Sequence, residues 1–494
     1  MKRISQTKLN IAGSVLLQIV SGTCGLILPR FMLQSFGSEV NGLVASVTQL
    51  LSYAVLLEGG IGGMMRAALY SPLANEDDAG VSSIFCQINR TFRIISLGFI
   101  GFAVILSICM KFFVDTQYSW FFVFTMVLIL SSHTLFSYYG SMPHRILMTA
   151  DQKLYVIQFT QIITRVLNLL LCLLVMRMGG GIHMVKLASG AVFLLNPIVQ
   201  RLYVKRHYKL TRNIAVGYTG HIQKRDGMIH HLSYFIHRNT DVVILSLLGS
   251  LQTVSVYTVY YTVINMLEQL LVSLSSGVSG LVGRLIARKE ITELNRIVER
   301  YEACNNALAT AVATVCAILI LPFVSIYTGG VTDAQYHQPV FALLMIGGSY
   351  AYSIRHPFGC VVLAAGHYKE TNTGAVGEVV INLVLSLVLV KPLGLVGVAL
   401  GTLVAMSFRT IHTVWYLSKH ILCRPIWKFL LKVVCNLMIS GILINRMPVW
   451  VDLSATNILG LFLCAIKVSV IVFPTFAGIN ALLSLKMFKG LFRV

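Results

Sequence analysis

Five positive side chains lie inside long apolar stretches of this 494-residue chain. Such a charge costs about 2.5 to 3.5 kcal/mol in hydrocarbon on the lenient insertion scale, so it normally faces water or a partner. The cations are Arg165, Arg238, Arg355, Arg409 and Lys467. The acids in similar positions are Glu58, Asp241, Glu268 and Glu378. Because guanidinium groups bind phosphate through paired hydrogen bonds, the excess of cations predicts a cavity that prefers a phosphorylated headgroup.

One of these cations belongs to a polar stripe on a single helical face. Between positions 154 and 176 the stripe recurs at steps of three and four, as Gln158, Gln161, Arg165, Asn168 and Cys172. A counterpart stripe lies near 373–390, as Thr371, Gly374, Glu378, Asn382 and Ser386. We therefore predict that the headgroup is bound in a central cavity by Arg30, Arg165, Arg238, Arg355, Asn168 and Gln161.

Several of these assignments have a structural alternative. The small residues before Arg30 could line a cavity or form a helix-packing surface. Arg238 and Asp241 are i, i+3 neighbours and could neutralise each other within one helix. Arg409 and Lys467 could extend to a membrane interface. The candidates for ion coupling are the three acids Asp241, Glu268 and Glu378.

The residues give no support for a metal, an organic cofactor or a catalytic centre. The ten cysteines are scattered without a CxxC pair, so we expect them to be reduced and inert. His230, His231 and His237 cluster, but no carboxylate or cysteine spacing accompanies them. In place of a cofactor, a proton gradient, a sodium gradient or the membrane potential could drive the function of the chain.

The elements that carry these residues are membrane-spanning helices. The chain is 56% hydrophobic and 12% charged, with a mean hydropathy of +0.78. Stretches of roughly 20 apolar residues, long enough to cross a bilayer, follow one another. We expect about fourteen, near 9–31, 41–65, 91–113, 119–139, 154–176, 182–202, 229–249, 253–276, 305–327, 340–363, 373–390, 395–417, 428–444 and 457–483. The predicted class is an all-α polytopic membrane protein.

The net charge of +21 has a topological explanation that does not require nucleic acid. With the N-terminus inside, most of the 39 Lys and Arg fall on the inner side, chiefly in 201–225 and 284–300. An even number of crossings then places both termini in the cytoplasm. The first stretch is too long for a secretory signal and is expected to remain as an uncleaved helix.

Four nearly equal offsets indicate an internal repeat. Gly37-Ser38 matches Gly249-Ser250, Asn168 matches Asn382, Gly190 matches Gly401, and Lys153 matches Lys369. Six spans per half predict two lobes related by a pseudo-two-fold axis along the membrane normal. We assign an N-terminal lobe at 1–203, a cytoplasmic linker at 204–228, a C-terminal lobe at 229–420 and two additional helices at 421–494.

Two segments carry a resemblance to a known family. NGLVASVTQLLSYAVLLEGGIG at 41–62 and LAAGHYKETNTGAVGEVVINLVLSLVLVKPLGLVGVALGTLVA at 363–405 resemble the Wzx-type oligosaccharide flippases. These belong to the multidrug/oligosaccharidyl-lipid/polysaccharide exporter superfamily, with the MATE antiporters and the lipid II flippase. The resemblance implies two six-helix lobes around a cationic cavity that opens alternately to each side. It makes Arg30, Arg165 and Arg238 the natural headgroup contacts.

The resemblance also implies a cargo and a location. The cargo would be an undecaprenyl-diphosphate oligosaccharide, moved from the inner to the outer leaflet of the bacterial cytoplasmic membrane for surface polysaccharide assembly. Glycosyltransferases and a polymerase of the same pathway would be partners, and the last two helices could hold the polyprenyl tail.

Two other functions stay open. A MATE-type antiporter of cationic drugs would need a cavity richer in carboxylates and aromatics, which the cation excess disfavours. A membrane glycosyltransferase or polymerase would need an extramembrane catalytic loop, and the outer links are short. The one acidic run, Glu76-Asp77-Asp78, is expected to cap or solvate an interfacial helix. We therefore expect a transporter and not an enzyme.

Overall fold

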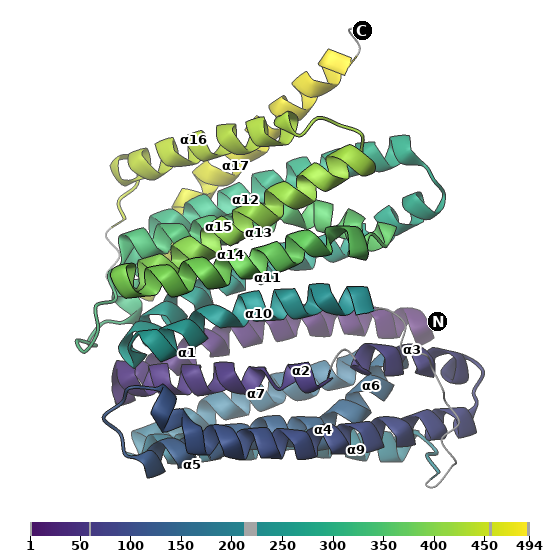
Figure 1. The fold of residues 1–494 in the computed structure, drawn as a ribbon, viewed down its shortest axis with the longest axis vertical. Coiled ribbons are helices and arrows are strands. Elements are labelled where there is room, and N and C mark those ends of the chain that lie inside the picture. The colour runs from purple at the N-terminus through teal and green to yellow at the C-terminus, as the bar shows by residue number, and fades with distance from the viewer. Residues whose placement is uncertain (1, 59–60, 212–224, 454–456, 492–494) are drawn as a thin grey trace. The chain divides into compact units, whose positions relative to one another are not determined.

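The computed structural model describes residues 2–58, 61–211, 225–453 and 457–491, and these are almost entirely helical (Figure 1). They divide into two compact units, of which the first holds residues 1–223 and 250–252. The second holds 224–249 and 253–494. In its described residues, each of the fourteen predicted stretches is mostly helical, which confirms the all-α class.

The N-terminal unit is built from nine α-helices and one short π-helix within its described residues. They are α1 (Lys2–Ser52), α2 (Val55–Glu58), α3 (Ile61–Ala74), α4 (Asp78–Phe113), α5 (Trp120–Phe136), η1 (Ser137–Ser141), α6 (Met142–Ala150), α7 (Leu154–Arg177), α8 (Ile182–Phe193) and α9 (Leu195–His207). Asp77 caps α4 by accepting a hydrogen bond of 2.9 Å from the Gly80 N–H, as expected of the acidic run.

The C-terminal unit continues the series with eight further helices in its described residues. They are α10 (Arg225–Leu248), α11 (Leu251–Ala287), α12 (Ile291–Tyr327), α13 (Pro339–Ala365), α14 (Tyr368–Leu393), α15 (Leu395–His420), α16 (Trp427–Trp450) and α17 (Ile458–Leu491). The predicted linker at 204–228 includes 212–224, which lie outside the described residues, as do the side chains of His230 and His231.

Ten helices in the described part are long and apolar enough to cross a membrane. One of them, Leu9–Ser52, covers the first predicted stretch and the first half of the second, which the sequence had separated, and the rest of the second stretch falls on α2 and α3. Gly37 bends it, with φ 79° and ψ 177°, a conformation that favours glycine. The predicted stretches of α10, α11 and α13 fall outside the ten, although these helices are 24, 37 and 27 residues long.

Large apolar side chains on the outer surface, such as Phe112 and Leu459, suit a lipid solvent.

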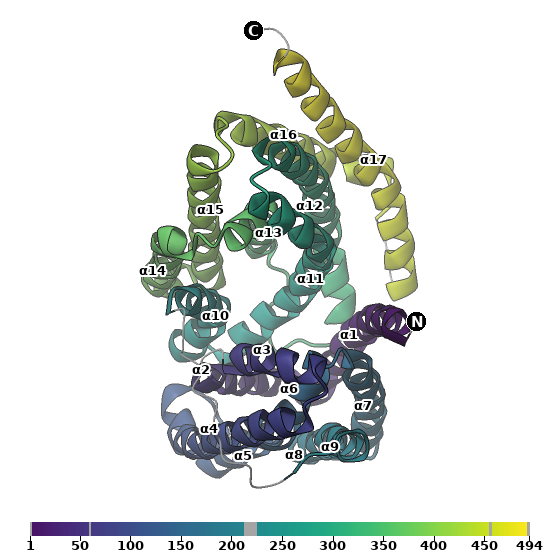
Figure 2. The ribbon, with the colours of Figure 1, turned by 90° about the vertical axis from the view of Figure 1, so that its right-hand side faces the viewer.

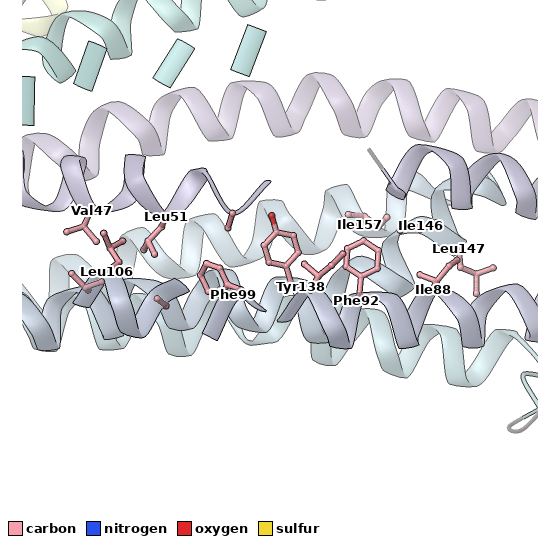
Figure 3. Packing of buried hydrophobic residues seen from close by; sticks show 14 of the residues in the cluster. Val47, Leu51, Ile88, Phe92, Phe99, Leu106, Tyr138, Ile146, Leu147 and Ile157 are labelled. Atoms are coloured by element: carbon pink, nitrogen blue, oxygen red, sulfur yellow. The ribbon is translucent and has the colours of Figure 1, made fainter. Parts of the chain in front are cut away.

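The core of the N-terminal unit follows one face of α4 (Figure 3). Ile88, Phe92, Phe99 and Leu106 recur at helical spacing and are buried against Val47 of α1 and neighbouring helices. The first residues of α11 also belong to this unit: a Cβ on Gly42 would lie 1.9 Å from the Leu251 carbonyl oxygen. Glycine is therefore required where α1 meets this segment.

The fourth predicted stretch is longer than the sequence indicated. It was expected to end near Tyr139, but the chain passes through η1 and continues as α6 to Ala150. Pro143 lies in the first turn of α6, where its missing N–H is tolerated. The π-helix and this proline carry the helix about eleven residues beyond its expected end and bring Arg145 into the unit.

Candidate functional site

In the C-terminal unit, one carboxylate holds two arginines. The Glu378 carboxylate on α14 lies 3.1 Å from Nη1 of Arg355 on α13 and 3.8 Å from Nε of Arg409 on α15. All three residues are buried or nearly so, with Glu378 5% exposed. Removing one partner from such a cluster would leave a buried charge uncompensated. Arg409 therefore points inward to a carboxylate, not outward to an interface.

Asp241 lies in the same unit among neutral donors. Its carboxylate accepts hydrogen bonds from Thr402 Oγ1 at 2.8 Å, Tyr257 OH at 3.0 Å and Asn382 Nδ2 at 3.4 Å. The residue is 3% exposed. No Lys or Arg of the described chain lies within ion-pair distance of it, although the buried His237 interacts with it electrostatically. A carboxylate held in this way can accept a proton or a small cation.

Arg238 finds its charge partner on the next helix. It pairs with Glu268 of α11 and also donates to the Asn265 side-chain oxygen. The Arg238 guanidinium carbon lies 5.7 Å from the ring centres of both Tyr261 and Tyr352. The sequence suggested Asp241, on the same helix, as a partner for Arg238, and the partner Glu268 on another helix was not predicted.

Arg165 and Gln161 lie in a different environment, at a cavity of about 230 Å³ inside the N-terminal unit. The lining comes from α5 to α9 and η1: His133, Phe136, Ser137, Ser141, Arg145, Gln161, Thr164, Arg165, Gly190, Phe193, Leu194, Asn196, Pro197 and Gln200. Contacts of α7 with α8 and α9, and of α5 with α8, bring these segments together, and Figure 2 looks along them. No Asp or Glu belongs to this lining.

Hydrogen bonds between neutral side chains hold the cavity wall. Ser141 Oγ donates to Gln200 Oε1 at 2.6 Å, joining η1 to α9. Thr164 Oγ1 donates to Asn196 Oδ1 at 3.3 Å, joining α7 to α9. Neither Arg145 nor Arg165 makes an ion pair with any described residue, and Glu58, which interacts electrostatically with Arg145, does not line the cavity.

The structure thus separates the predicted headgroup residues. Arg165 and Gln161 line the N-terminal cavity, whereas Arg238 and Arg355 are paired with carboxylates in the C-terminal unit. Asn168 is buried on α7 outside the cavity lining and accepts from Cys172 Sγ at 3.4 Å. Arg30 is half-buried on α1, immediately after Pro29. The expected central cavity between the lobes stays a prediction.

Two features were absent from the sequence-based prediction. Arg145 was placed beyond the end of its helix, because no signal marked the continuation through η1. Glu302 was placed just before its predicted stretch, yet it is 1% exposed and binds Arg424 and, at 3.2 Å, Lys432 of α16. Lys467 of α17 is exposed, which is compatible with the interfacial alternative.

Comparison with known proteins places this arrangement in a known architecture. No family model and no curated protein sequence matches the chain. Among solved structures, the lipid II flippase MurJ in an inward closed conformation matches with a TM-score of 0.73 at 15% identity, covering 98% of this chain and 100% of MurJ. The chain has the MurJ and MATE fold.

The MATE transporters share a smaller part of this fold. An inward-facing MATE transporter of the MOP superfamily matches with a TM-score of 0.59 at 13% identity, covering 81% of this chain and 94% of its own. The MATE multidrug transporter DinF-BH gives 0.61 at 17% identity, with 85% and 97% covered. The share of this chain that MurJ covers beyond the share covered by the MATE transporters is about the length of α16, α17 and their links.

Proposed function

We propose that this chain is a flippase for a polyprenyl-diphosphate-linked oligosaccharide. It would move this lipid from the inner to the outer leaflet of the bacterial cytoplasmic membrane, for assembly of a capsule, O-antigen or exopolysaccharide. The MurJ and MATE fold supports a multi-pass transporter. The observation that carries the choice of cargo is the N-terminal cavity, whose lining holds Arg145 and Arg165 and no Asp or Glu.

The proposed mechanism separates the three parts of the cargo. The diphosphate pairs with arginines, the sugars stay in water, and the polyprenyl tail stays in lipid. Alternating access then carries the headgroup across without exposing its charge to hydrocarbon, which would cost many kcal/mol. Release outside needs the pairing to weaken, and the membrane potential supplies about 2.3 kcal/mol per charge per 100 mV.

Asp241 is our choice among the ion-coupling candidates. Glu268 and Glu378 are already neutralised by arginines, whereas Asp241 is held by hydroxyl and amide donors. Uptake of a proton or sodium ion by Asp241 would add a positive charge to the buried interior of the C-terminal unit. Such a change could be coupled to the reorientation of the transporter.

A MATE-type antiporter of cationic drugs is the second candidate. It is favoured by Asp241, a buried carboxylate that could attract a cation, and by the likeness to MATE transporters. It is disfavoured because the other two candidate acids are paired with arginines. We rank it below the flippase, and a membrane glycosyltransferase or polymerase lower still.

The deciding experiment uses the purified chain in proteoliposomes. Fluorescent polyprenyl-diphosphate oligosaccharide should become accessible on the opposite leaflet faster than in empty vesicles. A cationic dye such as ethidium should not be transported. Dye transport without lipid translocation would instead establish the antiporter, and incorporation of labelled sugar would establish an enzyme.

A further inference from the structure

The two units can be aligned by a small feature that both contain. Tyr203 and His207 near the end of α9 stack with ring centres 4.0 Å apart, and Tyr416 and His420 near the end of α15 stack at 4.5 Å. In each pair the histidine Nδ1 lies 2.9 to 3.0 Å from the tyrosine carbonyl oxygen. The matched residues are 213 positions apart. This geometry fixes the register between α9 and α15.

Offsets of 213 on α15 and 214 on α13 and α14 assign a counterpart to each member of the Glu378 cluster. Thr164 lies 214 positions before Glu378, as Asn168 does before Asn382 on the same pair of helices. Ser141 lies 214 positions before Arg355, as Pro143 does before Pro357. Asn196 lies 213 positions before Arg409. Three charged residues of the C-terminal unit therefore correspond to three neutral residues of the N-terminal unit.

The contacts agree with this correspondence. Glu378 and Arg409 form an ion pair at 3.8 Å, and their counterparts Thr164 and Asn196 form a hydrogen bond at 3.3 Å. The neutral counterparts Thr164, Ser141 and Asn196 all line the cavity. The cavity therefore occupies, within its own unit, the place that the charged cluster fills in the other.

Two arginines face this space from positions that have no charged counterpart. The register matches Arg145 to Gly359 and Arg165 to Val379. Glu58 interacts electrostatically with Arg145, but it does not line the cavity. The N-terminal unit thus retains two guanidinium groups at the site and lacks the carboxylate that balances the pair in the C-terminal unit.

We propose that a phosphoryl anion occupies this cavity and supplies the negative charge that Glu378 supplies in the other unit. A phosphate or diphosphate can accept paired hydrogen bonds from both arginines. The cavity, at about 230 Å³, is smaller than the roughly 300 to 1,000 Å³ of sites for drug-sized ligands. It would therefore bind the phosphoryl group and make no contact with the sugars of an oligosaccharide. Its biological ligand, the diphosphate of the cargo, rests on the proposed function.

The first test measures anion binding by the full chain in nanodiscs of zwitterionic lipid. Inorganic pyrophosphate and phosphate are titrated by calorimetry, and polyprenyl diphosphate is added in a separate arm. We expect binding in at least one arm, weakened about tenfold or more by Arg145→Gln and by Arg165→Gln. Arg201→Gln, an exposed arginine at the end of the same unit, is the matched control and should bind as wild type.

The second test places the carboxylate of the C-terminal unit into the N-terminal one. Thr164→Glu should pair internally with the two arginines and abolish anion binding, while the thermal midpoint stays at or above that of wild type. Thr164→Gln, of similar size and without charge, should retain most of the binding. Undiminished binding by Thr164→Glu, or no binding of any anion by wild type, would overturn the site.

The arms distinguish the source of the anion and separate the site from the function. Displacement of polyprenyl diphosphate by pyrophosphate assigns the site to a lipid headgroup, whereas binding of the free anions alone assigns it to a free phosphate. Anion binding without lipid translocation would refute the flippase and keep the site. Translocation at wild-type rates by Arg145→Gln, Arg165→Gln and Thr164→Glu would refute the role of this site in binding the lipid headgroup and keep the flippase.

Discussion

The two units use corresponding positions in opposite ways. In the C-terminal unit, Glu378 binds Arg355 and Arg409 and fills the space between α13, α14 and α15. In the N-terminal unit, Ser141, Thr164 and Asn196 line a cavity whose wall holds two arginines and no Asp or Glu. The repeat has kept the positions and the contacts while changing the charge. In our proposal, the arginines of the C-terminal unit are paired with that unit's own carboxylate, whereas those of the N-terminal unit bind an anion from outside the chain.

The largest expected effect comes from breaking the charged cluster. Glu378→Gln leaves Arg355 and Arg409 buried without a carboxylate and should lower the free energy of unfolding by about 3 to 5 kcal/mol. Chemical unfolding in mixed micelles would measure this. The variant that also carries Arg355→Met and Arg409→Met should regain most of the loss, because no unpaired charge remains. Equal stability of the single variant and wild type would contradict the ion-pair account.

The opposite result is expected from the N-terminal arginines. Arg145→Gln with Arg165→Gln should slow translocation of the lipid-linked oligosaccharide about 100-fold, since each charge-assisted contact contributes about 1.5 to 3 kcal/mol. The thermal midpoint should change little, because neither arginine makes an ion pair with a described residue, although Arg145 interacts electrostatically with Glu58. A large loss of stability with normal translocation would make these arginines structural and remove the contrast between the units.

The sequence predicted the helices well. Apolar length and helical spacing are local properties, so α7 and α14 could be placed with Arg165 and Glu378 on their polar faces. Charge partners are not local: Glu268 reaches Arg238 from another helix, and Glu378 holds arginines from two. The excess of cations was correctly counted, but only the fold shows that most are neutralised in the C-terminal unit.

Arg145 illustrates a second reason why the sequence did not predict the whole site. Hydropathy falls after Tyr139, so the sequence ends the helix there, but η1 inserts an extra residue into the turn and α6 continues beyond it. The side chain is thereby carried to the cavity wall. Neighbouring segments decide such a continuation, and no pattern within the segment itself predicts it.

A smaller effect should separate ion coupling from headgroup binding. Asp241→Asn removes the one candidate acid that lacks an arginine partner and should abolish the response of translocation to an imposed proton or sodium gradient. Basal translocation without a gradient should change less than tenfold. Glu290→Gln, at an exposed acid before α12, is the control. A gradient response that survives in Asp241→Asn would assign coupling elsewhere.

The smallest expected effect concerns two hydrogen-bonded links, one beside the end of α9 and one near the end of α15. Tyr208 donates a hydrogen bond of 2.6 Å to Asp151, while the Tyr416 hydroxyl lies 2.9 Å from His367 Nδ1. Tyr208→Phe should cost about 1 kcal/mol of unfolding free energy. Tyr416→Phe removes the other link, in the C-terminal unit, and a difference of several kcal/mol between the two variants would show that the links differ in strength.

Tyr208 also gives a pH dependence. Burial, and then the hydrogen bond to Asp151, raise the pKa of Tyr208 well above its usual range. The unfolded chain loses this proton first, near pH 10, so the stability that the link provides is fully present below about pH 10 and declines above it. Unfolding of Tyr208→Phe between pH 9 and 11 should show a flatter decline than wild type. An identical decline in both would contradict this assignment.

The most direct measurement is an experimental structure with a heavy phosphate analogue. Tungstate added to the wild-type chain should give an anomalous peak between the guanidinium groups of Arg145 and Arg165. The same peak should be absent from Thr164→Glu, in which the introduced carboxylate takes its place. A wild-type cavity without the peak, or a peak of equal strength in Thr164→Glu, would contradict the claim that an external anion completes the N-terminal unit.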